Sequence, residues 1–341
     1  MIAFKVLVFM FFGKTGIMII RAILALAAVW LYMVCIISAQ AANPADIYPD
    51  NKVDWLDMKI IGDNWLSTDL TPADIDNSGD VNAVDYAILA NNWGWVGTPA
   101  PNDMVFVYIN DAGISGHESF TGYMSKYETT NAQYCQFLNA ANVSGDITVL
   151  GGYIVGYNGS NSGADFVGQK YYDPAGPGYD WPRDGSINGG AARINYIGGV
   201  FTVDSGFDNH PVTYVSWYGA TAFCNYYGYR LPTLWEWQAV ADYDGSFNYG
   251  CGPSINNSIA NYYNSIHPDG TTVVGSFGTY GYGMCDMAGN VWEWTSSAYN
   301  YPYYFSHYGG WVSKDNYCTV SSWYYNFAYF MYCTSGFRVC R

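Results

Sequence analysis

Basic residues and histidines are scarce in this sequence, which limits what the protein can bind. Of 341 residues, 13 are Lys or Arg and 28 are Asp or Glu, so the formal net charge is −15. Nucleic acids and anionic membrane surfaces are therefore poor partners, whereas cations such as calcium are suitable ligands. The four histidines show no metal-ligand spacing. No Ser-His-Asp set or pair of carboxylates indicates catalysis of those kinds.

Aromatic residues and glycine, by contrast, are abundant. The chain has 34 tyrosines and 38 glycines, and 19% of its residues are aromatic. This composition favours a loop-rich globular protein over a helical one. The length is sufficient for two or more domains with a sizeable core.

A long apolar run lies near the N-terminus, at residues 22–37. Arg21 precedes it and Ala39-Gln40-Ala41 follows it, an arrangement typical of a secretory signal peptide over residues 1–41. Met18 offers an alternative start. An uncleaved anchor is the other interpretation, because the run approaches the length that crosses a bilayer. We expect an exported bacterial-type protein, secreted or at the cell surface, with no other membrane contact and with disulfides allowed.

Residues 46–65 and 74–93 repeat each other with a period of 28. In the second copy, oxygen-bearing side chains recur at alternate loop positions around Gly79, which is the pattern of a calcium loop. Both loops lead into apolar-periodic segments typical of short helices. We predict a calcium-binding module at residues 44–96. The expected ligands of the second loop are Asp74, Asp76, Ser78, Asp80 through its carbonyl, Asn82 and Asp85.

The first loop is a weaker match to this pattern. Tyr48 stands at a ligand position and Asn51 replaces the glycine, so we expect a lower calcium affinity. The retained acidic residues are Asp46, Asp50, Asp54 and Asp57. This pair of loops resembles a dockerin, a module of paired half EF-hands. The resemblance implies a cohesin-like scaffold as partner.

A short segment with Pro and Gly, residues 97–103, reads as a linker before the large domain at 104–341. That domain opens with an apolar, strand-like run at residues 104–108. Thr130 or Asn131 then precedes a segment with Tyr134, Phe137 and Leu138 on one face. These features predict a capped amphipathic helix.

Five motifs of the large domain occur in a characteristic order. They are KYETTNAQYCQFLNA at 126–140, PVTYVSW at 211–217, GYRLPT at 228–233, GNVWEW at 289–294 and GFR at 336–338. Together they resemble the domain of the sulfatase-modifying factors, the formylglycine-generating enzymes. The resemblance implies an α+β fold, that family's loop-rich variant of the C-type-lectin-like fold.

The resemblance also implies an active site, which this sequence matches only in part. The family oxidises its substrate with two cysteines, five positions apart after a Gly-Gly pair, that bind Cu(I). Here Gly309-Gly310 is followed by Ser313 and Cys318. Cu(I) requires soft thiolates, which a serine hydroxyl does not supply. Cys318 is therefore catalytic, with Cu(I) as cofactor, only if another ligand such as Cys333 replaces the missing thiol.

Structural calcium in the large domain is a further implication of the resemblance. The positions that match the family's ligands are Asn261, Asp269, Asn290, Val291 through its carbonyl, and Glu293. Oxygen ligands on irregular backbone suit calcium. The alternative is that Asn290 and Glu293 only hydrogen-bond the turn in which they lie.

Seven cysteines remain once the signal segment with Cys35 is removed. Because the number is odd, at least one is free or forms an intermolecular bond. The resemblance implies a disulfide between Cys224 and Cys340, although Cys340 is one residue from the expected position. Cys318 is then either the unpaired thiol or the partner of Cys333.

The segment between Gly310 and Gly336 is rich in Tyr, Trp, Phe, Asn and Ser. These residue types form adaptable binding surfaces, and aromatic faces suit sugars. We predict a ligand-binding loop that includes Trp323, Tyr324, Tyr325, Asn326 and Tyr329. The preferred role is a non-catalytic or reassigned binding domain for a protein or glycan, in a cell-surface or polysaccharide-degrading assembly. The alternative is a formylglycine-generating oxidase that modifies a sulfatase cysteine.

Overall fold

The computed structural model describes residues 55–64, 73–75, 79–91, 101, 104–111, 119–158, 166–176, 179–180, 188–263 and 270–341. The expected signal peptide, and the linker apart from Pro101, lie outside these residues. In the part that is described, no helix is long and apolar enough to cross a membrane.

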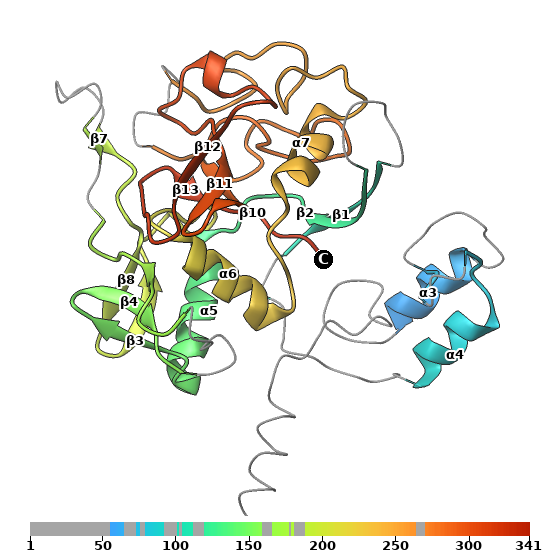
Figure 1. Cartoon of the computed structure of the whole chain (residues 1–341), viewed down its shortest axis with the longest axis horizontal. Coiled ribbons are helices and arrows are strands. Elements are labelled where there is room, and N and C mark those ends of the chain that lie inside the picture. Colours follow the sequence, from blue (N-terminus) through green and yellow to red (C-terminus); the bar gives the residue numbers. More distant parts are fainter. Residues whose placement is uncertain are drawn as a thin grey trace, which may run out of the picture. The chain divides into compact units, whose positions relative to one another are not determined.

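Two short helices form in the repeated segment, as the apolar periodicity predicts (Figure 1). They are α3 (Trp55–Asp63) and α4 (Ala83–Asn91). Ile61 of α3 and Leu89 of α4 are buried together with Val81, which precedes α4. Burial of such side chains contributes about 1.5–3 kcal/mol each, so this small cluster holds the two helices against each other.

The large domain alternates short strands and helices with much irregular chain. Its elements up to the second helix are β1 (Phe106–Asp111), β2 (Phe120–Ser125), α5 (Asn131–Ser144), β3 (Ile147–Leu150), β4 (Tyr153–Gly156), β5 (Lys170–Tyr172), β6 (Tyr179–Asp180), β7 (Asn188–Gly189), β8 (Ile194–Ile197), β9 (Val200–Val203) and α6 (Trp217–Tyr227). The remainder are α7 (Leu234–Asp242), β10 (Trp292–Asn300), β11 (Tyr303–His307), the 3₁₀ turn η1 (Asp315–Tyr317), β12 (Trp323–Phe327) and β13 (Ser335–Gly336). The mixture of helices and strands confirms the α+β expectation.

The main sheet is four-stranded, in the order β12-β11-β10-β13. β10 pairs antiparallel with β11 and parallel with the short β13. The predicted first strand is confirmed as β1, which pairs antiparallel with β2. The end of the chain returns to β2, because the backbones of Tyr123 and Arg341 exchange hydrogen bonds of 3.0 and 2.8 Å (Figure 1).

Local sequence signals explain where the helices begin. Thr130 caps α5 in a capping box with Gln133, as one of the two predicted caps. Thr233 and Glu236 form the same arrangement at α7. Ser216 caps α6 through the Gly219 N–H. Each such cap contributes about 1 kcal/mol to helix stability.

The main core lies where α5 and α6 pack against the C-terminal segment. Tyr134, Phe137 and Leu138 are buried, as the predicted apolar face requires. The ring of Phe223 on α6 lies 5.7 Å from that of Phe137 and 5.3 Å from that of Phe337, both edge-on. Edge-to-face pairs add about 0.5–1.5 kcal/mol beyond burial.

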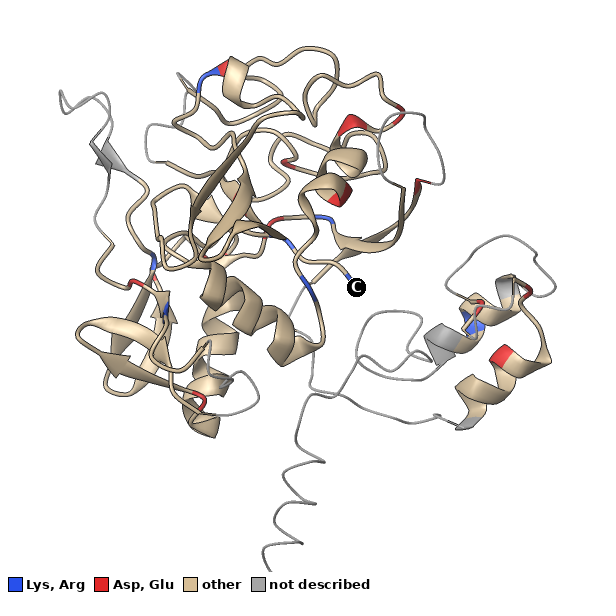
Figure 2. Cartoon of the chain, viewed as in Figure 1, with Lys and Arg blue, Asp and Glu red and all other residues tan. Residues whose placement is uncertain are grey.

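Lys and Arg residues are sparse along the part of the chain that the structure describes (Figure 2).

Candidate functional site

The acidic loop before α4 is closed by its own carboxylates. Asp74 Oδ2 accepts a hydrogen bond of 2.9 Å from the Gly79 N–H. The two oxygens of Asp85 accept bonds of 2.7 and 2.8 Å from the N–H groups of Ile75 and Asn82. Gly79 has φ +94°, a conformation that favours glycine. The structure thus brings the first and last predicted ligands of this loop, both buried, into one turn.

The other predicted ligands of this module are less well placed or lie outside the described residues. The Asp80 carbonyl accepts a hydrogen bond of 3.0 Å from the Asn82 side chain, and the Asp80 side chain is exposed. Outside the described residues are Asp76, Ser78, Asp46, Asp50, Asp54 and the side chain of Asp57. Among the described residues, no group of three or more His, Cys, Asp or Glu side chains is placed to hold a metal. Calcium binding here stays a prediction.

The Gly289-Asn290 turn is held by its backbone geometry and by the Asn290 side chain. Both residues have positive φ, +87° and +58°, and a Cβ on Gly289 would lie only 2.3 Å from the Asn261 carbonyl oxygen. Asn290 Oδ1 accepts from the Thr272 N–H at 2.9 Å and from Asn261 Nδ2 at 3.3 Å. Asn290 Nδ2 donates to Glu128 Oε2 at 2.8 Å. These bonds tie the turn to three segments that are distant in the sequence.

Glu293, another predicted calcium ligand, forms a buried ion pair. Its two carboxylate oxygens lie 2.7 and 2.8 Å from Nε and Nη2 of Arg338. Trp237 Nε1 also donates to the carboxylate, at 2.7 Å. The structure therefore brings Asn261 and Asn290 together, but it pairs Glu293 with a guanidinium. The Val291 N–H donates to Glu128, and Asp269 lies outside the described residues, so calcium at this place also stays a prediction.

Two further buried carboxylates interact electrostatically with Arg338. Burial first, and then the negative charges of Asp286 and Glu293, hold the pKa of Glu128 well above its usual value. Burial likewise raises the pKa of Asp286 to about 6, against the opposing effect of its hydrogen bond from the Gly275 N–H. This part of the domain therefore concentrates negative charge around one cation. These residues line neither of the hollows described below.

Ser313, at the position of the missing thiol, is part of a tight turn. Its hydroxyl accepts hydrogen bonds from the Gly310 N–H at 3.1 Å and from Trp292 Nε1 at 3.2 Å. The Ser313 carbonyl accepts from the Tyr263 N–H at 2.9 Å. A hard hydroxyl in this network does not supply the thiolate that Cu(I) requires. Ser313 and Cys318 therefore do not fit a two-thiolate copper site.

Cys318 is a buried thiol with a raised pKa. It is fully buried, and its Sγ donates to the Lys314 carbonyl at 3.5 Å. Burial, followed by the charge of Cys251, raises the pKa of Cys318 to about 12. The neutral thiol is therefore its stable form near neutral pH, which disfavours both metal binding and nucleophilic attack. Cys333, which the sequence suggested as a second ligand, lines the hollow described next, whereas Cys318 does not.

An aromatic hollow of about 810 Å³ opens beside Ser313. The rings of Trp292 and Tyr308 lie 4.3 Å apart, and Tyr308 in turn lies 5.1 Å from Tyr317 and 6.0 Å from Tyr324. Asn326, Lys314 and Thr334 add polar groups to the lining, and Cys333 also contributes. A connected series of ring faces with amide and hydroxyl groups between them is suited to binding a polar ligand with apolar faces. We call this the aromatic hollow.

The predicted ligand-binding loop is divided between two faces because part of it is the strand β12. Tyr324 and Asn326 line the aromatic hollow. Trp323 and Tyr325 do not line it: their rings lie 5.0 Å from Phe305 and 4.1 Å from Tyr299. Successive side chains of a strand point to opposite faces. Tyr329, the last residue predicted for this loop, packs on Phe327 at 5.0 Å outside the hollow.

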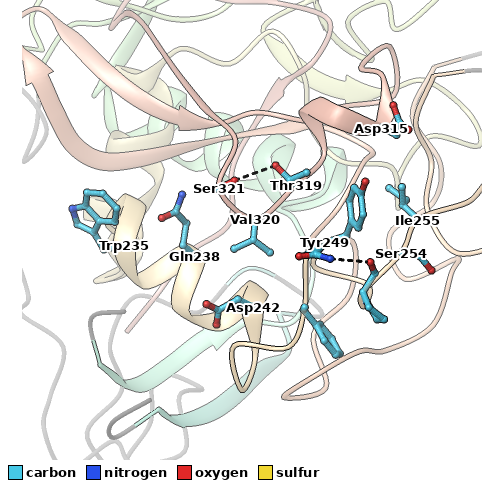
Figure 3. A pocket seen from close by; sticks show the side chains of 13 residues that line it. Trp235, Gln238, Asp242, Tyr249, Ser254, Ile255, Asp315, Thr319, Val320 and Ser321 are labelled. Carbon is cyan, nitrogen blue, oxygen red and sulfur yellow. Dashed lines mark hydrogen bonds between the residues drawn. The ribbon is translucent and has the colours of Figure 1, made fainter. Parts of the chain in front are cut away.

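A second hollow, of about 1100 Å³, lies beside α7 (Figure 3). Trp235 and Gln238 of α7 line one part of it, and Tyr249, Asp315 and Thr319 line another. No local sequence pattern predicts that these residues lie together, because they come from three segments up to 84 positions apart (319 minus 235). We call it the α7 hollow.

The cysteines expected to form a disulfide are both present as free, buried thiols. Burial, and next the charge of Cys340, raises the pKa of Cys224, so the two thiols interact. The backbone of Cys340 pairs with Arg230 through hydrogen bonds of 2.7 and 2.9 Å. The Cys224–Cys340 disulfide stays a prediction.

Sequence reasoning missed several residues that shape these sites. Glu128 contacts Asn290, which lies 162 positions away in the sequence. The rings of Trp292 and Tyr308 come together through the register in which β10 and β11 pair. One available signal was that Glu128 and Trp292 lie inside the recognised motifs. Trp235 had a weaker signal, because it is a large aromatic residue just after the GYRLPT motif; the structure places it half exposed in the first turn of α7.

Comparison with known proteins gives a family match. A family model described as a sulfatase-modifying factor enzyme 1-like domain matches residues 117–341, more than half of the chain. A formylglycine-generating enzyme of Bos taurus is 26% identical over 203 residues, 51% of this chain and 48% of that protein. The counterpart of Mycobacterium tuberculosis is 35% identical over 107 residues, 28% of this chain and 36% of that protein.

Other matches differ in their names. The serine/threonine-protein kinase pkn1 of Chlamydia caviae is 40% identical over 115 residues, 33% of this chain and 18% of that protein. The chain thus spans less than half the length of these relatives. Among solved structures, CarF has a TM-score of 0.46 at 21% identity and covers 70% of this chain and 95% of its own. Treponema denticola variable protein 1 has a TM-score of 0.43 at 16% identity, with coverage of 70% and 91%.

Proposed function

Because this chain belongs to the sulfatase-modifying factor enzyme 1-like domain family, we propose that its large domain uses the family's fold to bind a ligand in the aromatic hollow. The match over residues 117–341 and the mixed architecture establish the α+β fold of the formylglycine-generating-enzyme type. The ligand that we propose is a neutral glycan, held by tyrosine and tryptophan faces.

The chemistry of the aromatic hollow supports a glycan over a charged ligand. Sugar rings have apolar faces that pack on aromatic rings and hydroxyl edges that hydrogen-bond to amides and hydroxyls. Tyr324, which is 52% exposed, and Trp292 offer such faces, and Asn326 and Thr334 offer polar partners. Lys314 is the one charged residue among those that line the hollow.

The non-catalytic assignment depends on the hydrogen bonds of Ser313 and on the burial and pKa of Cys318. The Ser313 hydroxyl is engaged by the Gly310 and Trp292 N–H groups. Cys318 is fully buried and does not line the aromatic hollow. A reactive cysteine needs access and a lowered pKa, whereas the pKa of Cys318 is raised.

We further propose that the protein is exported and that residues 44–96 form a dockerin-like calcium module that binds a cohesin-like scaffold. The closed turn between Asp74 and Asp85 supports this, because carboxylates at both ends of a glycine-containing loop suit calcium. The two modules together then place a glycan-binding domain in a cell-surface or polysaccharide-degrading assembly.

A glycan array, followed by calorimetric titration with its strongest neutral oligosaccharide, tests the proposed ligand. Tyr324→Ala is expected to weaken binding about 5- to 30-fold, because it removes one ring face, about 1–2 kcal/mol. Trp323→Ala is the matched control: Trp323 is the adjacent residue of β12, 45% exposed, and does not line the hollow. Equal losses in the two variants would contradict the assignment of the hollow. A folded protein that binds no glycan on the array would contradict the glycan ligand.

The formylglycine-generating oxidase is the second candidate, and the named relatives favour it. This candidate requires a second soft ligand beside Cys318, and Cys251 is the thiol whose charge acts on it. If only one residue of a copper site was lost, Ser313→Cys should restore Cu(I) binding. Under our proposal the Ser313→Cys variant gains no Cu(I) binding, because residue 313 belongs to a turn beside the aromatic hollow.

A further inference from the structure

The glycan site proposed above leaves the α7 hollow without a role. The lining of this hollow of about 1100 Å³ combines three aromatic side chains, Trp235, Phe247 and Tyr249, with the carboxylates of Asp242 and Asp315 (Figure 3). Among the described residues that line it, none is Lys, Arg or His. The hollow therefore joins ring faces to negative charge, without a basic side chain to neutralise that charge.

One wall of the α7 hollow is a face of the helix α7. Trp235, Gln238 and Asp242 occupy positions i, i+3 and i+7, which lie on one side of an α-helix. The other side of α7 is held in the core, where Trp237 and Val240 are 1% and 2% exposed. The Trp235 side chain is 51% exposed, so its ring is accessible to a ligand. This wall presents an aromatic ring and a carboxylate from a firmly packed helix.

The end of α7 adds negative potential and positions a second ring. Asp242 is the last residue of the helix, where the aligned peptide dipoles place partial negative charge. Its backbone carbonyl accepts hydrogen bonds from the N–H groups of Gly245 and Phe247, at 3.1 and 3.3 Å. These bonds turn the chain back, and Phe247 lines the same hollow. A cation is favoured here by both the carboxylate and the helix end.

The rest of the wall comes from two segments that are distant in the sequence but paired in the structure. Tyr249 and Thr319 form an antiparallel bridge, and the Val320 N–H donates to the Asn248 carbonyl at 2.9 Å. Val320 also packs in the same core cluster as Trp237 and Val240 of α7. The two parts of the lining are therefore connected through the core, and the hollow is largely pre-formed, as ligand sites usually are.

The chemistry of the lining favours an organic cation over a metal ion. Aromatic faces attract ammonium groups through their quadrupole, and carboxylates attract them through their charge. Lys314, which precedes Asp315, lines the aromatic hollow instead. Calcium takes about six to eight oxygen ligands. Among the residues that the structure describes, no group of three or more His, Cys, Asp or Glu side chains is placed to hold a metal.

We propose that the α7 hollow is a second ligand site, which binds an organic ammonium ion through its aromatic faces and its two carboxylates. The ammonium group belongs either to a small alkylammonium compound or to a lysine side chain of a peptide, and the probes below distinguish these sources. No described residue lines both hollows. The proposal does not rest on the glycan ligand, so the two titrations can fail separately.

Calorimetric titration of the full chain with choline and with 3,3-dimethyl-1-butanol, its uncharged isostere, tests the first source. The peptide acetyl-Gly-Lys-Gly-amide and its Gln counterpart test the second. Calcium is present throughout, so that the repeated segment contributes no heat. We expect one of the two cations to bind about tenfold or more tightly than its uncharged control. The cation with the higher affinity identifies the source. If neither cation exceeds its control, the proposal is overturned.

Two variants place the bound cation in the α7 hollow. Asp315→Asn and Trp235→Ala should each weaken its binding about fivefold or more. Asp244→Asn is the matched control for charge, because Asp244 is exposed and does not line the hollow. Trp323→Ala is the control for an exposed tryptophan, at 45% exposure. Both controls should bind as the wild type does.

Equal losses in Asp315→Asn and Asp244→Asn would show that the cation responds only to net charge, and would overturn the proposal. Asp315 is exposed and Trp235 half exposed, so both substitutions should leave the fold intact. Should Trp235→Ala fail to fold, the comparison of Asp315→Asn with Asp244→Asn still decides.

Discussion

The carboxylate of Glu293 and the guanidinium of Arg338 form a two-point ion pair that is fully buried, with N···O distances of 2.7 and 2.8 Å. The two residues lie 45 positions apart and belong to the GNVWEW and GFR motifs. Arg338 also donates to the backbone carbonyls of Ser125, Lys126 and Cys285. The pair therefore joins the start, the middle and the end of the domain, which gives the two motifs a structural role independent of any ligand.

Removal of the guanidinium should be strongly destabilising. In Arg338→Met, Glu293 remains buried without its partner, and the expected loss is about 3–5 kcal/mol in the free energy of unfolding. Arg230→Met is the matched control, because its pair with Glu236 at 2.6 Å is half exposed and contributes about 1 kcal/mol or less. Urea denaturation of both variants measures the difference. Similar losses would show that burial does not determine the strength of the pair.

The stability of the domain should depend on pH through Asp286. Its pKa in the folded state, about 6, is above its ordinary value of 3.8, so the folded protein binds this proton more tightly than the unfolded chain. The contribution of this group to stability is thus greatest below pH 4 and is lost as the pH rises to 6. In Asp286→Asn this loss is absent.

The free energy of unfolding of Asp286→Asn, relative to wild type, should therefore increase by about 2–3 kcal/mol between pH 4 and pH 7. Denaturation at both pH values measures it. The amide oxygen still accepts from the Gly275 N–H, so the main backbone contact is retained. A difference that does not change with pH would contradict the raised pKa.

Removal of calcium should destabilise the repeated segment, which precedes the large domain in the sequence. Hydrogen exchange of the amides of α4 is expected to accelerate at least tenfold on addition of EGTA, because bound calcium stabilises the folded state by mass action. Asp85→Ala should exchange rapidly with or without EGTA. Asp80→Ala, which removes only an exposed side chain, should respond as the wild type does. Exchange rates that EGTA leaves unchanged in the wild type would contradict calcium binding.

Local sequence signals predicted much of this fold. The Thr130 cap and the apolar face with Phe137 identified α5, because capping and helical periodicity depend on residues a few positions apart. The five motifs identified the family, which the family model independently supports. The aromatic segment before Gly336 pointed to the hollow that Tyr324 and Asn326 line.

Contacts between distant segments were not predictable in this way. The division of Trp323 and Tyr324 between two faces depends on the register of β12 against β11, which no local pattern specifies. Tyr249 and Thr319 line one hollow because a backbone bridge joins them across 70 positions (319 minus 249). The GNVWEW motif likewise does not reveal that Arg338 pairs with Glu293.

An oxygen-dependent assay on a peptide with a sulfatase-type Cys-x-Pro-x-Arg motif tests the central claim, that this domain binds a ligand and does not oxidise cysteine. The domain is supplied with one equivalent of Cu(I), and mass spectrometry follows the peptide. We predict that the cysteine is recovered unchanged, because Ser313 is not a thiol and Cys318 is fully buried. Copper-dependent conversion of the cysteine to an aldehyde over many turnovers would contradict the account.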